Sequence, residues 1–92
     1  MKTRDENAVV PVVFRMWTAR NGGGCIALFP TLDAGGGCCD SYEHIGQHGA
    51  ADYGVVVRNT RPAKPGEYAN LKRELESAPY FYRLRVIRRR PK

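Results

Sequence analysis

Residues 38 to 53, CCDSYEHIGQHGAADY, combine side-chain types that bind metals or act as nucleophiles and bases. Zinc prefers thiolate and imidazole ligands, so a metal site in this chain would use Cys38, Cys39, His44 and His48. Their spacing is unfavourable, because adjacent cysteines on a strand point to opposite faces and the glycines on either side of His48 weaken a helix that would pair the histidines. We therefore expect no metal and no other cofactor.

A Cys/His-based enzyme is an alternative for the same segment. It would use Cys38 or Cys39 as the nucleophile, His44 or His48 as the base, and a carboxylate to orient the imidazole. The carboxylates of this segment belong to Asp40, Glu43 and Asp52. No complete catalytic signature surrounds them, so the catalytic residues stay unknown and a protein without catalytic activity is the preferred hypothesis.

The interpretation that we favour is a non-catalytic binding or interaction module that uses residues 42 to 53. Functional groups concentrate on loops, and this stretch is dense in polar side chains. The candidate contact residues for an unidentified protein or small ligand are Tyr42, His44, Gln47, His48, Asp52 and Tyr53.

The net charge of +6 belongs to the C-terminal end of the chain. Residues 1 to 82 carry nine basic and nine acidic side chains, whereas residues 83 to 92 carry basic ones only. Nucleic-acid binding is therefore a further alternative, with phosphate contacts from Arg83, Arg85, Arg88, Arg89 and Arg90. The competing structural explanation is that basic side chains keep an edge strand soluble and unpaired.

Alternating apolar side chains predict a strand over residues 10 to 17 with one buried face, formed by Val10, Val12, Phe14 and Met16. Pro11 cannot donate to a ladder, so this strand should start after it or lie at an edge. The glycine-rich residues 18 to 24 predict a hairpin loop. The run CIALF then predicts a second strand that Pro30 ends.

The remaining elements follow from local composition. CCDSYEHI is a weaker third strand, residues 46 to 54 form a loop, and YGVVVRN predicts a fourth strand because it is rich in β-branched residues. Pro65 suits a first helical position, and apolar residues at helical spacing predict a helix that Pro79 closes. The run YFYRLRVIRR predicts a last strand with a basic outer face.

The order β-β-β-β-α-β predicts an α+β fold. We expect a mostly antiparallel sheet of four to five strands, with one helix from the C-terminal half of the chain packed on one face. A helix of three turns spans only about 18 Å, so part of the apolar face would stay bare. A homodimer that buries this face is therefore a further prediction.

Length and composition suit one domain over residues 1 to 92, with residues 1 to 9 flexible and residues 88 to 92 forming a basic tail. The longest apolar runs are much shorter than the roughly 20 residues that cross a bilayer, and the first residues lack the apolar core of a secretory signal. Three cysteines without a redox spacing indicate reduced thiols. We expect a cytoplasmic protein that does not contact membranes.

The runs IALFP, SYEHIGQHGAADY, TRPAKPGEYANLKRELES and LRVIRR occur in this order. In them the chain resembles a group of small uncharacterised bacterial proteins, some of which look like products of mobile gene cassettes. The resemblance spans most of residues 12 to 90, and the glycines at 22 to 24 and 35 to 37 depart from it. It implies a bacterial cytosolic origin and no particular activity.

Overall fold

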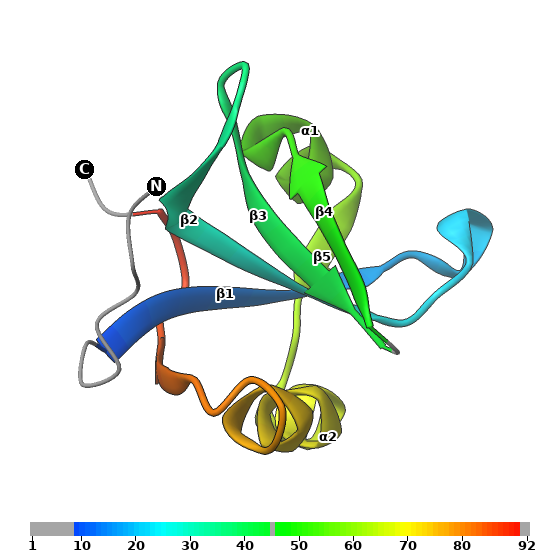
Figure 1. The fold of residues 1–92 in the computed structure, drawn as a ribbon. Helices are drawn as coiled ribbons and strands as arrows, with labels where there is room; N and C mark the ends of the chain where they lie inside the picture. The colour runs from blue at the N-terminus through cyan, green and yellow to red at the C-terminus, as the bar shows by residue number, and fades with distance from the viewer. Residues whose placement is uncertain (1–8, 45, 91–92) are drawn as a thin grey trace.

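The computed structural model describes residues 9–44 and 46–90. This part of the chain forms six strands and two α-helices, which confirms the α+β class (Figure 1). The strands are β1 (Val9–Trp17), β2 (Cys25–Gly35), β3 (Cys38–Glu43), β4 (Gln47–Ala51), β5 (Thr60–Pro62) and β6 (Arg83–Val86). The helices are α1 (Tyr53–Arg58) and α2 (Pro65–Glu76), and a single 3-10 turn, η1 (Ala19–Asn21), lies in the loop between β1 and β2.

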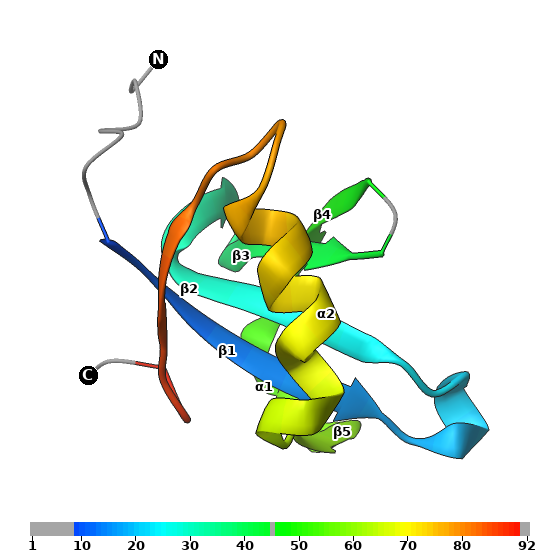
Figure 2. The same cartoon turned by 90° about the horizontal axis from the view of Figure 1, so that it is seen from below.

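The sheet runs in the order β4-β3-β2-β1, with antiparallel neighbours, and two short strands share the far edge of β1. β5 pairs antiparallel with residues 15–17 of β1, and β6 pairs parallel with residues 9–12. Figure 2 shows β6, the unlabelled orange-red strand, beside the beginning of β1, and β5 beside the end of β1. Because β5 and β6 run towards each other along one edge, both segments must leave the sheet where they meet.

The sheet is buried on both faces, with α2 on one and α1 on the other (Figure 1). The core on the α2 side contains Val10, Val12, Phe14, Ala27, Phe29, Tyr42, Leu71 and Leu75. The core on the α1 side contains Val13, Ile26, Leu28, Cys39, Ala51 and Val56. The prediction that β1 buries only one face is therefore wrong: Val13 on its other face is 1% exposed, because α1 covers that face.

Arg15 lies on the α1 side of β1 and is also buried. Its guanidinium donates to Thr60 Oγ1 (2.9 Å), to the Thr60 carbonyl (2.8 Å) and to the Val57 carbonyl (3.0 Å). Burial lowers the pKa of Arg15, and the hydrogen bonds give its Nε and Nη2 groups acceptors within the protein. The side chain thus ties β1 to the C-terminal end of α1.

Two prolines lie inside strands, contrary to prediction. β1 starts at Val9, before Pro11, and is an inner strand of the sheet. Its pairing with β2 begins only at Val13. β2 therefore requires no N–H from Pro11. β2 continues through Pro30 to Gly35. Its pairing with β3 is interrupted between Phe29 and Asp33, and this irregularity accommodates the missing proline donor.

The strand predicted for YGVVVRN is wrong, because these residues form α1 and the first residue after it. Asp52 caps the helix, since its carboxylate accepts a hydrogen bond from the Val55 N–H (3.2 Å). At the other end Asn59 Nδ2 donates to the Val55 carbonyl (2.8 Å) and Thr60 Oγ1 to the Val56 carbonyl (2.7 Å). These caps and the burial of Val56 outweigh the strand preference of three consecutive valines.

The loop predicted for residues 46 to 54 is also wrong, because it contains β4, which pairs with β3 along its whole length. Other predictions are confirmed: the hairpin loop before β2, the third strand, the helix that begins at Pro65 and a last strand, which is limited to Arg83–Val86. Gly22, Gly23 and Gly24 have φ of 97°, 66° and 93°, a conformation that favours glycine. The flexibility predicted for residues 1 to 9 concerns mostly residues outside the described part.

No helix within the described part of the chain combines the length and the apolar character that a membrane span requires.

Candidate functional site

Tyr42, His44 and Glu74 form a hydrogen-bonded cluster on the α2 side of the sheet. The Tyr42 hydroxyl donates to Glu74 Oε2, and His44 Nδ1 contacts Glu74 Oε1. The Gly46 N–H donates to the Tyr42 hydroxyl (2.9 Å), so the turn after β3 is fixed to the same group. Tyr42 and His44 were both predicted as contact residues. They share a partner, Glu74 of α2, that the sequence pattern did not single out.

The charges in this cluster are well defined. Burial, reinforced by the hydrogen bond to Glu74, raises the pKa of Tyr42 above its usual value, so its hydroxyl stays a donor. Partial burial of Glu74 opposes its ionisation, but the hydrogen bonds from Tyr42 and His44 prevail and lower the pKa of this carboxyl. An ionised Glu74 can accept a hydrogen bond from His44 when the ring carries a proton on Nδ1.

His48 reaches the same side of the sheet from β4. It lies opposite Tyr42 in the β3–β4 ladder, with the two ring centroids 4.7 Å apart. Tyr80, which follows α2, packs edge-on against both rings, at 5.2 Å from Tyr42 and 5.1 Å from His48. The two histidines thus flank one buried tyrosine.

A groove of about 420 Å³ lies beside this cluster, and Cys25 lines it together with His44 and Glu74. Burial, with smaller contributions from Glu67 and Glu43, raises the pKa of the Cys25 thiol to about 12. A nucleophilic cysteine needs a lowered pKa, so the charges here act against activation of this thiol.

The cysteines of the predicted catalytic segment lie elsewhere. Cys39 belongs to the core on the α1 side, and burial raises the pKa of its thiol. Cys38 pairs with Gly35 at the start of β3, away from the turn that holds His44. Neither thiol joins the Tyr42 cluster, and among the described residues no three His, Cys, Asp or Glu side chains are close enough to hold a metal ion.

Asp52 and Tyr53, which were also predicted as contact residues, take part in the fold around α1. Asp52 is the N-cap described above, and Tyr53 packs against the core on the α1 side. The Tyr53 hydroxyl accepts a hydrogen bond from the Arg90 N–H (2.8 Å), and the Arg90 guanidinium lies 4.9 Å from the centre of its ring. The basic tail therefore turns back onto α1 at this point.

A second groove, which we call the β4 groove, runs between β4 and α1 on the α1 side of the sheet. It has a volume of about 390 Å³ and is lined by all five residues of β4 and by Trp17, Ile26, Ser41, Glu43, Asp52, Val55 and Val56. Two of the β4 residues that line the groove, Gln47 and His48, were predicted as contact residues. β4 is the outermost strand of the sheet, so one side of it has no strand partner within the described residues.

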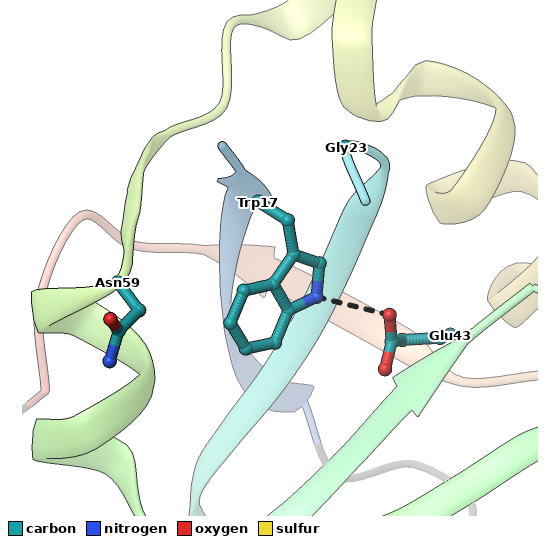
Figure 3. Close-up of a pocket in the computed structure, with 4 residues that line it drawn as sticks. All are labelled: Trp17, Gly23, Glu43 and Asn59. Atoms are coloured by element: carbon teal, nitrogen blue, oxygen red, sulfur yellow. Dashed lines mark hydrogen bonds between the residues drawn. The ribbon is translucent and has the colours of Figure 1, made fainter. Parts of the chain in front are cut away.

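The β4 groove shares Trp17 and Glu43 with a hollow of about 540 Å³ that extends to Gly23 and Asn59. Figure 3 shows the indole of Trp17 between Asn59 of the segment after α1 and Glu43 of β3. Trp17 Nε1 donates to Glu43 Oε2 (3.1 Å), which fixes both side chains. Sequence patterns missed this pair because its members are 26 residues apart and meet only through the β1–β2–β3 pairing.

The predicted phosphate-binding arginines lie on β6 and after it. Arg83, Arg85, Arg88, Arg89 and Arg90 are all exposed. Of these, Arg90 packs on Tyr53 as described.

Comparison with known proteins gives no match to a protein-family model, to a curated protein or to a solved structure.

Proposed function

We propose that this chain is a non-catalytic binding module that holds an extended segment of a partner protein against β4. The observation that carries this proposal is that all five residues of the outermost strand line the β4 groove. A segment added there would form main-chain hydrogen bonds with the free edge of β4 and place side chains in the groove.

β4 lacks the features that usually protect an edge strand. Such strands carry lysines, prolines, inward charges or bulges that prevent pairing with another chain. The sequence of β4 is QHGAA, which has none of these, and its first four residues are exposed. Only its short length limits pairing, which suits the capture of a short segment better than the growth of a sheet.

The side chains around the groove indicate which segment would bind. The carboxylates of Glu43 and Asp52 line it, next to the indole of Trp17, and none of its described lining residues is a lysine or arginine. A lysine or arginine of the partner would pair with a carboxylate and could pack against the indole face. We therefore expect the bound segment to be extended and to carry a basic side chain.

The test starts from a phage-displayed library of random dodecapeptides, selected on the immobilised protein. The affinity of an enriched peptide is then measured by calorimetry for the wild type and for Gly49→Leu. A Cβ added at Gly49 lies 3.6 Å from Ser41 Oγ, an ordinary contact, so the variant should fold while its larger side chain occupies the groove. We expect at least a tenfold weaker affinity, which corresponds to about 1.4 kcal/mol.

The matched control is Ala69→Leu. Ala69 is exposed on α2, on the other side of the sheet, and does not line the β4 groove. This variant should bind the peptide as the wild type does. A selection that enriches no peptide, or equal weakening by both substitutions, would contradict the proposal.

Nucleic-acid binding through the basic end of the chain is the second candidate function. It is favoured by the exposure of Arg85, Arg88 and Arg89 together with the neutral balance of residues 1 to 82. A mobility shift with a random-sequence DNA duplex and with its single strand, titrated with salt, tests it. Binding should weaken steeply with salt and further when Arg88, Arg89 and Arg90 are changed to Ser; no shift at low salt would rule this function out.

A further inference from the structure

A further hollow lies at the edge of the sheet opposite β4, where β5 and β6 meet along β1. The last hydrogen bonds before the two segments separate are from the Ala63 N–H to the Phe14 carbonyl (3.1 Å) and from the Ile87 N–H to the Val12 carbonyl (2.9 Å). Ala63 then packs on the α2 side of the sheet, whereas Ile87 packs on the α1 side. The two segments therefore diverge and leave a cavity between them.

This cavity, which we call the β5–β6 pocket, has a volume of about 680 Å³. That volume is within the range of pockets that bind small molecules, roughly 300 to 1,000 Å³. Its apolar residues are Phe14, Pro62, Ala63, Pro65, Tyr68, Val86 and Ile87. The rings of Phe14 and Tyr68 are stacked, with centroids 4.5 Å apart and planes inclined by 10°, so one wall is flat and aromatic.

Among the described residues, every charged side chain that lines the β5–β6 pocket is basic. These side chains are Arg61, Lys64 and Arg88. Arg61 already donates to Glu67, with Nη1 2.8 Å from Oε1, and this pair lowers the pKa of Glu67 to about 2. Within the described part of the chain, Arg88 has no hydrogen bond or ion pair, and no carboxylate lines the pocket to pair with it.

From this combination we infer that the β5–β6 pocket binds a small anion with a flat apolar body, such as an aromatic carboxylate or an aryl phosphate. The body would lie against Tyr68 and the prolines, and the anionic group would face Lys64 and Arg88. An apolar cavity with a few convergent charges is the usual composition of a small-molecule site. This site is separate from the β4 groove and does not depend on the function proposed there.

The probes are 1-naphthoate and 1-naphthyl phosphate, with 1-naphthylmethylamine as the cationic analogue of the same shape. Each is titrated into the uniformly ¹⁵N-labelled protein while amide shifts are followed by NMR. We expect saturable shifts with at least one anion, centred on Ala63, Tyr68, Ile87 and Arg88, and no saturation with the amine. The anion that binds more tightly identifies the preferred head group.

Two charge reversals separate this site from general attraction of anions. Arg88→Glu removes a lining charge, whereas Arg89→Glu changes the net charge equally at an exposed neighbour that does not line the pocket. We expect Arg88→Glu to weaken binding at least tenfold and Arg89→Glu to change it less than twofold. Equal effects of the two variants, shifts located elsewhere, or saturation with the amine would each overturn the inference.

Discussion

At the scale of single residues, Glu74 connects α2 to the end of β3, because its carboxylate is hydrogen-bonded to both Tyr42 and His44. Tyr42 is 1% exposed, so its hydroxyl depends on partners within the protein. A buried donor that loses its acceptor is costly, and a bond to a charged acceptor contributes more than a neutral one. Glu74 therefore stabilises the turn after β3 as well as α2.

We predict that Glu74→Gln lowers the free energy of unfolding by about 1–3 kcal/mol at neutral pH, measured by urea denaturation. The pKa of Glu74 is lowered in the folded state, so its ionised form adds stability above the pKa of the unfolded chain, about 4.3, and this stability is lost as the pH falls through the folded value. The difference between wild type and variant should therefore shrink in acid.

The control for this prediction is Glu76→Gln, also on α2. Glu76 pairs with Lys72 (2.9 Å) on an exposed part of the helix, and such pairs contribute roughly 0–1 kcal/mol. A loss for Glu74→Gln no larger than for Glu76→Gln would mean that the Tyr42 cluster does not stabilise the fold.

The cysteines give a second prediction at this scale. Burial raises the pKa of the Cys25 thiol to about 12 and also raises the pKa of Cys39, so both are protonated at neutral pH. Iodoacetamide should modify Cys25 and Cys39 of the native protein much more slowly than those of the protein unfolded in urea, as peptide mass spectrometry would show. Rapid modification of native Cys25 would instead indicate an activated thiol and favour the Cys/His enzyme.

At the scale of elements, residues 52 to 60 show where local preference is overruled. Three consecutive valines favour a strand, yet Asp52 at the start and Asn59 and Thr60 at the end satisfy the backbone groups of a short helix. The acid before the helix was visible in the sequence, but the sheet face that Val56 packs against was not. α2 was predictable because Pro65 at its first position and the apolar residues at helical spacing after it both indicate a helix.

We predict that Asp52→Ala lowers the free energy of unfolding by about 0.5–2 kcal/mol, because the Val55 N–H loses its acceptor. Asp52→Asn keeps a capping oxygen and should cost much less. Thermal unfolding followed by circular dichroism compares the two variants. Equal losses would mean that the charge of Asp52, and not the cap, is what stabilises α1.

β4 was not predictable for a different reason. Its glycine and alanines have low strand preference, and its structure depends on pairing with β3, whose register places Gly49 opposite Ser41. The Ser41 hydroxyl donates to the Gly49 carbonyl (3.0 Å), which reinforces the pair. The polar residues of this segment were therefore apparent in the sequence. Its strand geometry and its groove depend on pairing with β3 and on packing near α1, which the sequence does not show.

At the scale of the whole molecule, the described charges differ between the two edges of the sheet. Glu43 and Asp52 line the β4 groove, whereas the arginines lie on and after β6. The homodimer predicted from the sequence was meant to bury the part of the sheet face that a helix of three turns leaves bare. Beside α2, the segment after the helix also packs on this face, with Tyr80, Tyr82 and Leu84 against its core. Dimerisation stays a prediction that the mass at micromolar concentration tests.

The most direct test of the proposed function is amide hydrogen exchange of the protein with and without a dodecapeptide selected on it. If the peptide adds a strand, exchange should slow at alternate residues of Gln47–Ala51, whose N–H groups point away from β3. Residues of β6 should exchange as before. Unchanged exchange throughout β4 with the peptide bound, or slowing confined to β6, would contradict the account.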